Sequence, residues 1–437
     1  MAVTHRSLSI AIESSFGSLD SSTGLPSTSG LTYISIPCER DPIVIYGDVV
    51  ASERTDARDG AFGVPAEPDT VWASGSRVRR RTGSIECRVD LTTIGTAANT
   101  YDANYLGYLL GAGLLTKTPS LTSDTASAIA SVNKYTPTGT VTTADIGTLV
   151  GADLSGRAEY SAITDNDVSG DVTISPALSA NFTGTPTIRH LQTWYPGTRD
   201  RSGTKTHSVA FQVNGVDFKT DGFGCVLESI SISLDSGRLM ADLVYQAAII
   251  QDDHAAATGP VEPSYNTGAP AFFRGAYVVV SSTAPSSLTD PVAGDTLART
   301  DLNCEDFSFT LTNTLTPKGH SNSILAMSEM EISDIDVELT LTLSSPATAL
   351  NQDYFNRQLR QVLVGTGPVG DGLGCAIMIP CAYLNNDPSK YEVGGNDIVR
   401  QTLTYKQSRY NGDFDTGVTS PYDSNAGNSF LRIGLGI

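Results

Sequence analysis

The stretch Ser229–Gly237, with the sequence SISISLDSG, decides the fold. Isoleucine and leucine alternate in it with serine, so an extended strand would have one apolar and one polar face. Asp235–Gly237 then predicts a tight turn, and Leu243–Gln246 (LVYQ) predicts the strand that returns beside the first. The stretch therefore indicates an antiparallel sheet with one dry and one wet face.

A sequence similar to that of the returning strand occurs a second time in the chain. Leu243–Gln246 (LVYQ) resembles Leu403–Lys406 (LTYK), and the second copy also follows a glycine turn, Gly394–Gly395. In each half we expect a strand and a short helix upstream, and these strands are Ser84–Leu91 and Ile332–Leu343. A repeated strand, helix and strand without catalytic residues predicts a duplicated building block.

The two expected helices have recognisable ends. The first runs from about Asn104 to Leu110 and stops at Gly111, while the second begins after Asn351 and stops at Gly365. Asparagine accepts hydrogen bonds from free N–H groups at a helix start, and glycine adopts positive φ at a helix end without a Cβ clash. The second helix would carry Tyr354, Phe355, Leu359, Val362 and Leu363.

Alternation continues on both sides of the opening stretch. Val209–Val213 alternates apolar with small or polar residues, and Asn214-Gly215 predicts a type I′ turn, after which Val216–Phe218 would return. In the second half the alternating apolar residues are Phe307, Phe309, Leu311, Ile335, Val337, Leu339, Leu341 and Leu343. These patterns are typical of half-buried strands.

We predict a mainly β protein with two tandem β-rich modules, each with one short helix, and a small inserted β domain that could be a barrel or a sandwich. The first module comprises residues 1–128 and 191–253, the inserted domain 129–190, a linker with Pro and Gly 254–269, and the second module 270–437. The insertion, from about Ile129 to Arg189, is nearly free of Lys and Arg. Its expected core residues are Val141, Ile146, Leu149, Val150, Ile163, Val168, Val172, Ile174 and Leu178.

Composition supports many short strands and argues against wrapping around nucleic acid. The 437 residues include 41 glycines and only 17% charged residues, and the length suggests two or three domains. Asp and Glu number 47 against 28 Lys and Arg, which gives a net charge of −19. Phosphate binding depends on Lys and Arg, whereas an acidic wall repels phosphates and would let DNA pass without sticking.

Targeting segments and disulfides are not expected. Residues 1–16 contain no apolar run of signal-peptide length, and no run of about eighteen apolar residues predicts a membrane span. The six cysteines lack the dense spacing of a disulfide scaffold, so we expect free thiols: Cys38, Cys87, Cys225, Cys304, Cys375 and Cys381.

Motif matches do not predict an enzyme or a cofactor. Gly365–Gly370 has the letters of a dinucleotide fingerprint but follows an expected helix and contains proline, so we interpret it as a loop. Asp165–Gly170 imitates the start of an EF-hand, yet Pro176 occupies the position of the bidentate Glu. The five histidines are widely separated, and neither a nucleophile elbow nor a Walker loop occurs. We therefore expect no catalytic, metal or cofactor site.

Two charged groups are candidate functional residues. Arg77, Arg79, Arg80 and Arg81 form a dense basic cluster that could clamp an acidic patch on a neighbouring subunit, or could be a solvated loop. Asp334, Asp336 and Glu338 line the polar face of one expected strand. They could face a channel, or they could belong to an ordinary solvated surface.

With these residues in view, the chain resembles the tail tube proteins of long-tailed bacteriophages. Glu13–Gly17 (ESSFG) is similar to a short opening signature of that family. Gly222–Gln251 and Asn303–Leu343 resemble its paired strands, and Leu149–Thr187 resembles a small barrel inserted in some members. The likeness covers most of the chain as a pattern.

The resemblance implies tail-tube-like sandwiches with a flanking helix and a long hairpin, joined into stacked rings around a DNA channel. Two modules per chain imply a homotrimer with six-fold pseudo-symmetry, and we expect the insertion to lie outside the ring and to be dispensable for its assembly. The implied partners are further copies of the chain, tape measure, terminator and baseplate proteins, and DNA in passage, with no membrane. The implied location is the virion tail, after assembly in the host cytoplasm.

Two other functions remain open at this point. The chain could be another phage structural protein, such as a capsid decoration or baseplate component. A secreted bacterial adhesin built of β-domains is a different class, which the N-terminal sequence disfavours because it lacks an apolar signal segment.

Overall fold

The computed structural model describes most of the chain. The described residues are 6–19, 26–51, 79–91, 105–121, 123–154, 157–166, 170–179, 182–196, 208–216, 218–252, 277–282, 299–319, 327–367, 374–393, 399–408, 427 and 429–436. The expected linker at 254–269 lies outside them. Within them the protein is mainly β, as predicted, and no helix is both long and apolar enough to cross a membrane.

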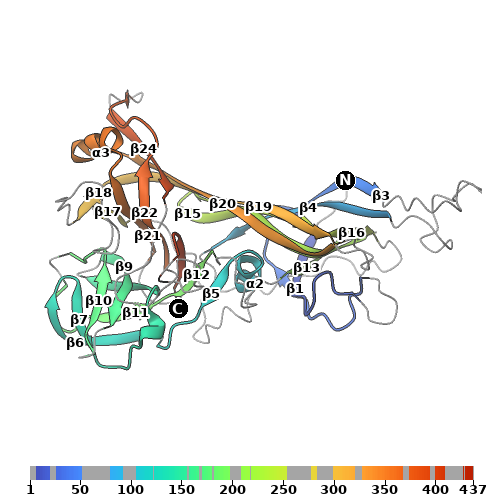
Figure 1. Ribbon diagram of the computed structural model, residues 1–437, viewed down its shortest axis with the longest axis horizontal. Coiled ribbons are helices and arrows are strands. Elements are labelled where there is room, and N and C mark those ends of the chain that lie inside the picture. The colour runs from blue at the N-terminus through green and yellow to red at the C-terminus, as the bar shows by residue number, and fades with distance from the viewer. Residues whose placement is uncertain are drawn as a thin grey trace, which may run out of the picture.

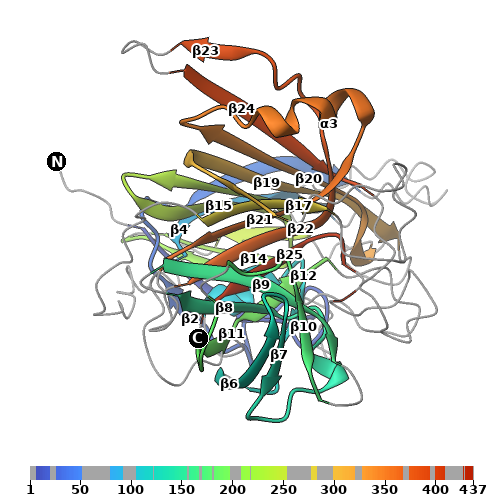
Figure 2. The same ribbon diagram turned by 90° about the vertical axis from the view of Figure 1, so that its left-hand side faces the viewer.

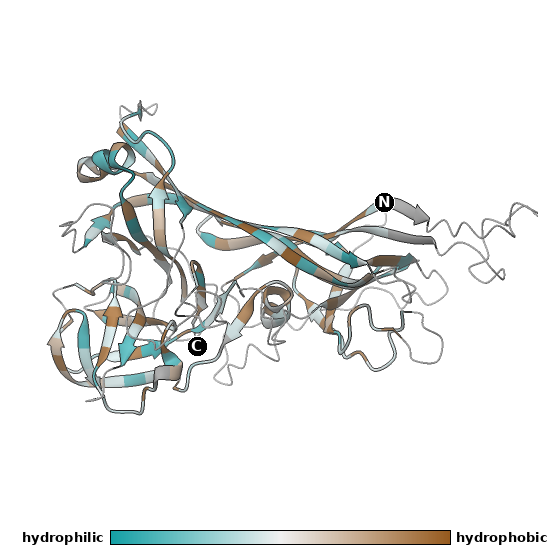
Figure 3. Ribbon diagram, viewed as in Figure 1, coloured by the Kyte–Doolittle hydropathy of each residue, from teal (hydrophilic) through white to brown (hydrophobic). Residues whose placement is uncertain are grey.

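One long antiparallel sheet runs through both halves of the chain (Figure 1). Its strands, in spatial order, are β3 (Ile43–Ala51), β4 (Arg79–Asp90), β15 (Arg238–Ala247), β14 (Lys219–Asp235), β19 (Cys304–Gly319), β20 (Met327–Leu343), β24 (Val399–Gln407) and β23 (Tyr391–Val393). We call this the long sheet. The alternation of apolar and polar residues is visible along its strands as a change of hydropathy from residue to residue (Figure 3).

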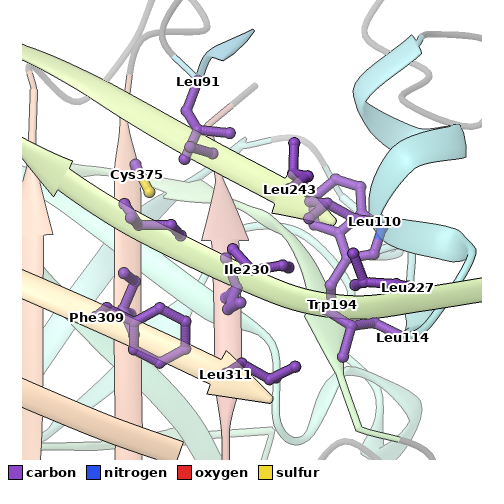
Figure 4. Packing of buried hydrophobic residues seen from close by; sticks show 14 of the residues in the cluster. Leu91, Leu110, Leu114, Trp194, Leu227, Ile230, Leu243, Phe309, Leu311 and Cys375 are labelled. Carbon is purple, nitrogen blue, oxygen red and sulfur yellow. The ribbon is translucent and has the colours of Figure 1, made fainter. Parts of the chain in front are cut away.

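Two shorter sheets lie against the dry side of the long sheet. In the first-half sheet the order is β2 (Ile34–Ile36), β1 (Ser7–Ile12), β13 (Val209–Asn214), the start of β14 and β16 (Ile249–Asp252). In the second-half sheet it is β18 (Thr300–Leu302), β17 (Tyr277–Ser282), β21 (Leu359–Thr366), β22 (Cys375–Leu384), β25 (Arg432–Leu435), β12 (Gln192–Tyr195) and β5 (Leu115–Lys117). One apolar core extends through both halves (Figure 4).

Strand β14 belongs to two sheets because it bends. Its first residues pair with β13 and β16, whereas Val226–Asp235 pair with β15. Gly224 lies between the two parts with φ +60°, a conformation that favours glycine. The N–H of Gly224 donates to the buried Glu13 carboxylate at 3.0 Å, and a Cβ there would lie 2.9 Å from the Phe16 ring. Residues of the Glu13–Gly17 signature thus hold this bend.

The two expected helices differ in outcome. Helix α2 (Tyr105–Gly111) confirms the first one. Helix α3 (Asn351–Asn356) is much shorter than predicted, because Arg357 adopts φ +49° and ends it, and the prediction that it reaches Gly365 was wrong. The remainder is strand β21, which is buried on both faces. Such a short apolar run has no periodicity that separates strand from helix.

The two predicted hairpin turns also differ. Asp235 pairs with Arg238, and Ser236 and Gly237 both have positive φ, as a two-residue hairpin turn requires. The type I′ turn predicted at Asn214-Gly215 is wrong, because Asn214 pairs with Lys219 and the loop has four residues. Gly215 instead lies against the ring of Phe218, where an added Cβ would be 2.1 Å from a ring carbon.

The insertion is a small closed barrel of six strands, as predicted. They are β6 (Ser123–Ser131), β7 (Lys134–Pro137), β8 (Leu149–Leu154), β9 (Arg157–Asn166), β10 (Val172–Ser175) and β11 (Thr187–His190). The barrel begins at Ser123, six residues before the predicted boundary, and Ala126 from this extra part joins its core. Val168 lies outside the described residues, and Leu149 points out of the barrel core into a separate cluster.

Candidate functional site

The wet face of the long sheet is lined by hydroxyl groups along its middle strands and by charged side chains, with Ile43 and Ile45 at its β3 end. Cross-strand register places Ser231 opposite Thr310, and Thr310 opposite Glu338. Apolar neighbours such as Ile232 and Phe309 are buried in the core on the other side. The exposed or half-exposed hydroxyl residues of this face include Ser229, Ser231, Ser233, Ser308, Thr310, Thr312, Thr314, Thr340, Thr342, Thr402 and Thr404.

The predicted acidic residues lie on this face, and two of them share a cation that was not predicted from the sequence. Asp334 and Asp336 are exposed, and Glu338 is half-buried. The Nζ of Lys406 is 3.3 Å from Asp336 Oδ2 and 3.5 Å from Glu338 Oε2. The hydrogen bond to Asp336 raises the pKa of Lys406. Asp336 and Glu338 therefore share Lys406, whereas Asp334 takes no part in this ion pair.

Other cations of the long sheet are also neutralised. Arg238 bonds Glu39 at 2.7 Å, and Arg400 bonds Glu305 at 2.8 Å. The remaining pairs join Arg88 to Asp235 and Asp242, and Lys318 to Glu329 and Glu331. Every basic side chain that the structure describes on β4, β15, β19, β20 and β24 therefore has a carboxylate within 4 Å. Such surface pairs contribute little stability, about 0–1 kcal/mol each, so their effect on the charge of the face matters more.

The long sheet ends in two edge strands. Among the described residues β3 pairs with β4 alone, and β23 pairs with β24 alone. Both edges carry large apolar side chains that water can reach. Ile43, Ile45 and Tyr46 on β3 are 41%, 47% and 45% exposed, and Tyr391 and Val399 at the other edge are 40% and 38% exposed. An exposed apolar edge is a template for pairing with another strand.

The two halves of the long sheet have matching parts. Tyr245 of β15 pairs with Ile85 of β4, and Tyr405 of β24 pairs with Leu339 of β20. Both tyrosines are fully buried, and in each half a helix follows the strand that the tyrosine strand pairs with. Tyr245 Oη donates to the Leu109 carbonyl of α2 at 2.9 Å. In the second half, Gln401 Nε2 of β24 donates to Asn351 Oδ1 of α3 at 3.0 Å, so that helix also lies against its tyrosine strand.

Because the two halves correspond, the junction between them can be compared with the free edges of the long sheet. Leu227 of β14 pairs with the first tyrosine, and Leu384 of β22 pairs with the second, while β23 continues along the same side of β24. On the other side of each tyrosine strand, β19 borders β20 as β3 borders β4. The β14–β19 ladder, from Ser229 paired with Thr312 to Ser233 paired with Ser308, therefore joins the β23-like edge of one half to the β3-like edge of the other. The two edges that remain free at the ends of the long sheet, at β3 and at β23, therefore match the two edges that this ladder joins.

The arginine cluster lies at one end of this sheet. Arg79, Arg80 and Arg81 begin β4, where they pair with Ala51, Val50 and Val49 of β3. Their side chains and the whole of Arg77 lie outside the described residues, so a role between subunits stays a prediction.

The dinucleotide-like and EF-hand-like motifs lie on strands and the connections between them. Gly365 is in strand β21 rather than at the start of a helix, and Gly170, with φ +86°, precedes β10. In the part of the chain that the structure describes, no three His, Cys, Asp or Glu residues are grouped to hold a metal ion. All six cysteines are free thiols, and burial raises the pKa of Cys38 and Cys375 to about 12.

Comparison of the sequence with models of known protein families gives no match, and a search of curated proteins gives none either.

Proposed function

We propose that this chain is a structural virion protein whose copies join head to tail into rings of three and stack into a phage tail tube. Each chain would supply two tail-tube-like sandwich modules. The observation that carries the proposal is the β14–β19 ladder, because one chain already joins two matching units through edges of the kinds that remain at β3 and β23.

The proposed contact between chains repeats this internal junction. Strand β23, with the neighbouring end of β24, would meet β3 of the next copy. A contact between two different surfaces closes into a ring when the rotation between copies is a simple fraction of a turn. Pairing would place side chains of the neighbouring strand beside Ile43, Ile45 and Tyr391, which are exposed in the single chain. Covering an edge removes the aggregation hazard that it otherwise presents.

The wet face of the long sheet would line the channel. Its hydroxyl groups are uncharged, and its described cations already have carboxylate partners within the same chain. Proteins bind duplex phosphates chiefly through Lys and Arg that release counterions. A wall whose cations are internally neutralised, in a chain of net charge −19, would offer DNA few such contacts. This property suits a conduit for DNA ejection.

The proposal is tested by blocking one edge. Ile45→Lys places a charge on β3 at a side chain that is 47% exposed, so the chain should fold normally while rings and tubes are lost in negative-stain images. Val132→Lys in the barrel changes a comparably exposed residue, at 39%, away from both edges and is the matched control. Equal assembly of both variants would reject the edge contact. Rings of six chains in wild-type images would reject the trimer, and capsid binding without tubes would favour a decoration protein.

A further inference from the structure

The inserted barrel docks on the outer face of the second-half sheet, although the first half of the sequence encodes it (Figure 2). Strands β17, β21 and β22 have apolar residues on both faces. One set joins the main core, while the alternate set faces the barrel. The docking cluster comprises Leu149, Tyr160, Ala162 and Leu191 from the barrel side and Tyr277, Val279, Leu363, Ala376 and Met378 from the sheet, none more than 3% exposed.

Tyr160 fits a place that only glycine leaves open. Its ring lies over Gly365 of β21, where an added Cβ would be 2.1 Å from the ring carbon Cδ2. Its Oη donates toward the carbonyl oxygens of Thr366 and Gly367, at 2.8 and 3.0 Å. Burial raises the pKa of Tyr160, so it remains a neutral donor. A well-packed tyrosine with a satisfied hydroxyl is typical of a permanent contact.

Charged and polar groups surround the apolar contact. Arg299 Nη1 lies 3.1 Å from Glu159 Oε2 of the barrel, and that carboxylate is 1% exposed. The same Arg299 bonds the Ala177 carbonyl at 2.9 Å, and its guanidinium lies 5.3 Å from the centre of the Tyr277 ring. Ser175 Oγ of the barrel donates to Gln361 Oε1 at 2.8 Å. A buried charge with several partners is strongly tied to one geometry.

The chain also enters and leaves the barrel through the second-half sheet. Strands β5 and β12, which flank the barrel in sequence, pair with each other, and β12 pairs with β25 near the C-terminus. The barrel, β12 and β25 therefore tie residues of the first half to the second-half sheet, while the β14–β19 ladder ties the two halves at the long sheet. These two separated attachments stand beside the apolar core that extends through both halves, so bending at the junction would disturb all of them.

We propose that the barrel is a brace that fixes the angle between the two halves of the chain, and that this angle is needed for the chain to close into a ring. From the sequence we expected the barrel to be dispensable for ring assembly, whereas this proposal predicts that ring assembly needs it. Removing the barrel would also expose Tyr277, Val279, Leu363 and Met378, an apolar patch that promotes aggregation. The ring-closing part of this inference rests on the proposed function, but the docking part does not.

A double-mutant cycle between Tyr160 and Gly365 tests the docking. Gly365→Ala should push the ring away and speed amide hydrogen exchange in β17 and β21 by about tenfold or more, because docking shields these strands. Gly319→Ala, where an added Cβ meets nothing within 4 Å, is the matched control and should change nothing. Tyr160→Ala with Gly365→Ala should exchange more slowly than Gly365→Ala alone, since the clash is gone. Additive losses would show a strand defect instead and overturn the docking argument.

Tyr160→Phe gives a milder variant that should fold, because it removes only the hydroxyl bonded to Thr366 and Gly367. Ring yield in negative-stain images is then measured beside hydrogen exchange for every variant. Lost protection with fewer rings supports the brace, and lost protection with an unchanged ring yield overturns it. A wild-type protein with full protection that never forms rings would overturn the proposed function alone.

Discussion

Reversing the charge at Asp336 and at Asp334 should have different effects on stability, although the two residues are neighbours on one face. Asp336 Oδ2 is 3.3 Å from Lys406 Nζ, whereas Asp334 lies outside that ion pair. Asp336→Lys removes one surface pair and creates a repulsion of similar size, which together should lower the free energy of unfolding by up to about 2 kcal/mol. Asp334→Lys should change it by about 0.5 kcal/mol or less, as for most exposed positions.

Urea unfolding of the two variants and the wild type measures the difference. High salt should reduce it, because the Debye length falls to about 3 Å at 1 M ionic strength. Equal destabilisation of the two variants, or a difference that salt leaves intact, would refute the role given to Lys406. In assembled tubes both variants would add a cation to the proposed channel wall and should slow DNA ejection in a salt-dependent manner.

Three further predictions concern buried groups. Tyr245→Phe should cost about 1 kcal/mol in thermal or urea unfolding, whereas Tyr405→Phe should cost almost nothing, because only the first hydroxyl has a hydrogen-bond partner among the described residues. Arg360→Met should lower the free energy of unfolding by about 3–5 kcal/mol, because it leaves the Asp353 carboxylate buried without its bidentate partner. Adding Asp353→Leu should restore most of this stability. A larger loss in the double variant would contradict the prediction. Burial lowers the pKa of His190 below 6.5, so the unfolded chain binds more protons and the free energy of unfolding should fall as pH drops from about 7 to 5. His190→Gln should have a shallower pH dependence in urea titrations, and an unchanged slope would contradict the assignment.

Local alternation was enough to predict much of the long sheet. Ser229–Gly237 forms the strand and turn that its pattern indicates, and Ile332–Leu343 lies within β20. The insertion could be predicted from the sequence because most of its apolar residues pack into one small core. These features depend on residues close in sequence or on a strict two-residue period, which a single sequence displays directly.

Features that depend on distant contacts were not predictable in the same way. Lys406 stands in the repeated closing strand, yet its partner Asp336 is 70 residues away, and only the β20–β24 register brings them together. Docking of the barrel did leave a signal, since Tyr277–Val280 and Val362–Val364 are continuous apolar runs. Such runs belong to strands buried on both faces, but they do not say what covers the second face.

Strand β14 has a mechanical consequence because it passes from one layer to another without a break. Its hydrogen bonds to β13 and β16 at one end, and to β15 and β19 at the other, lie across the strand direction. A force along β14 would therefore act on these ladders in shear, and many bonds would have to yield together before the strand could slide. The bend at Gly224 carries that tension from the first-half sheet into the long sheet through backbone alone, with no flexible connection to stretch first.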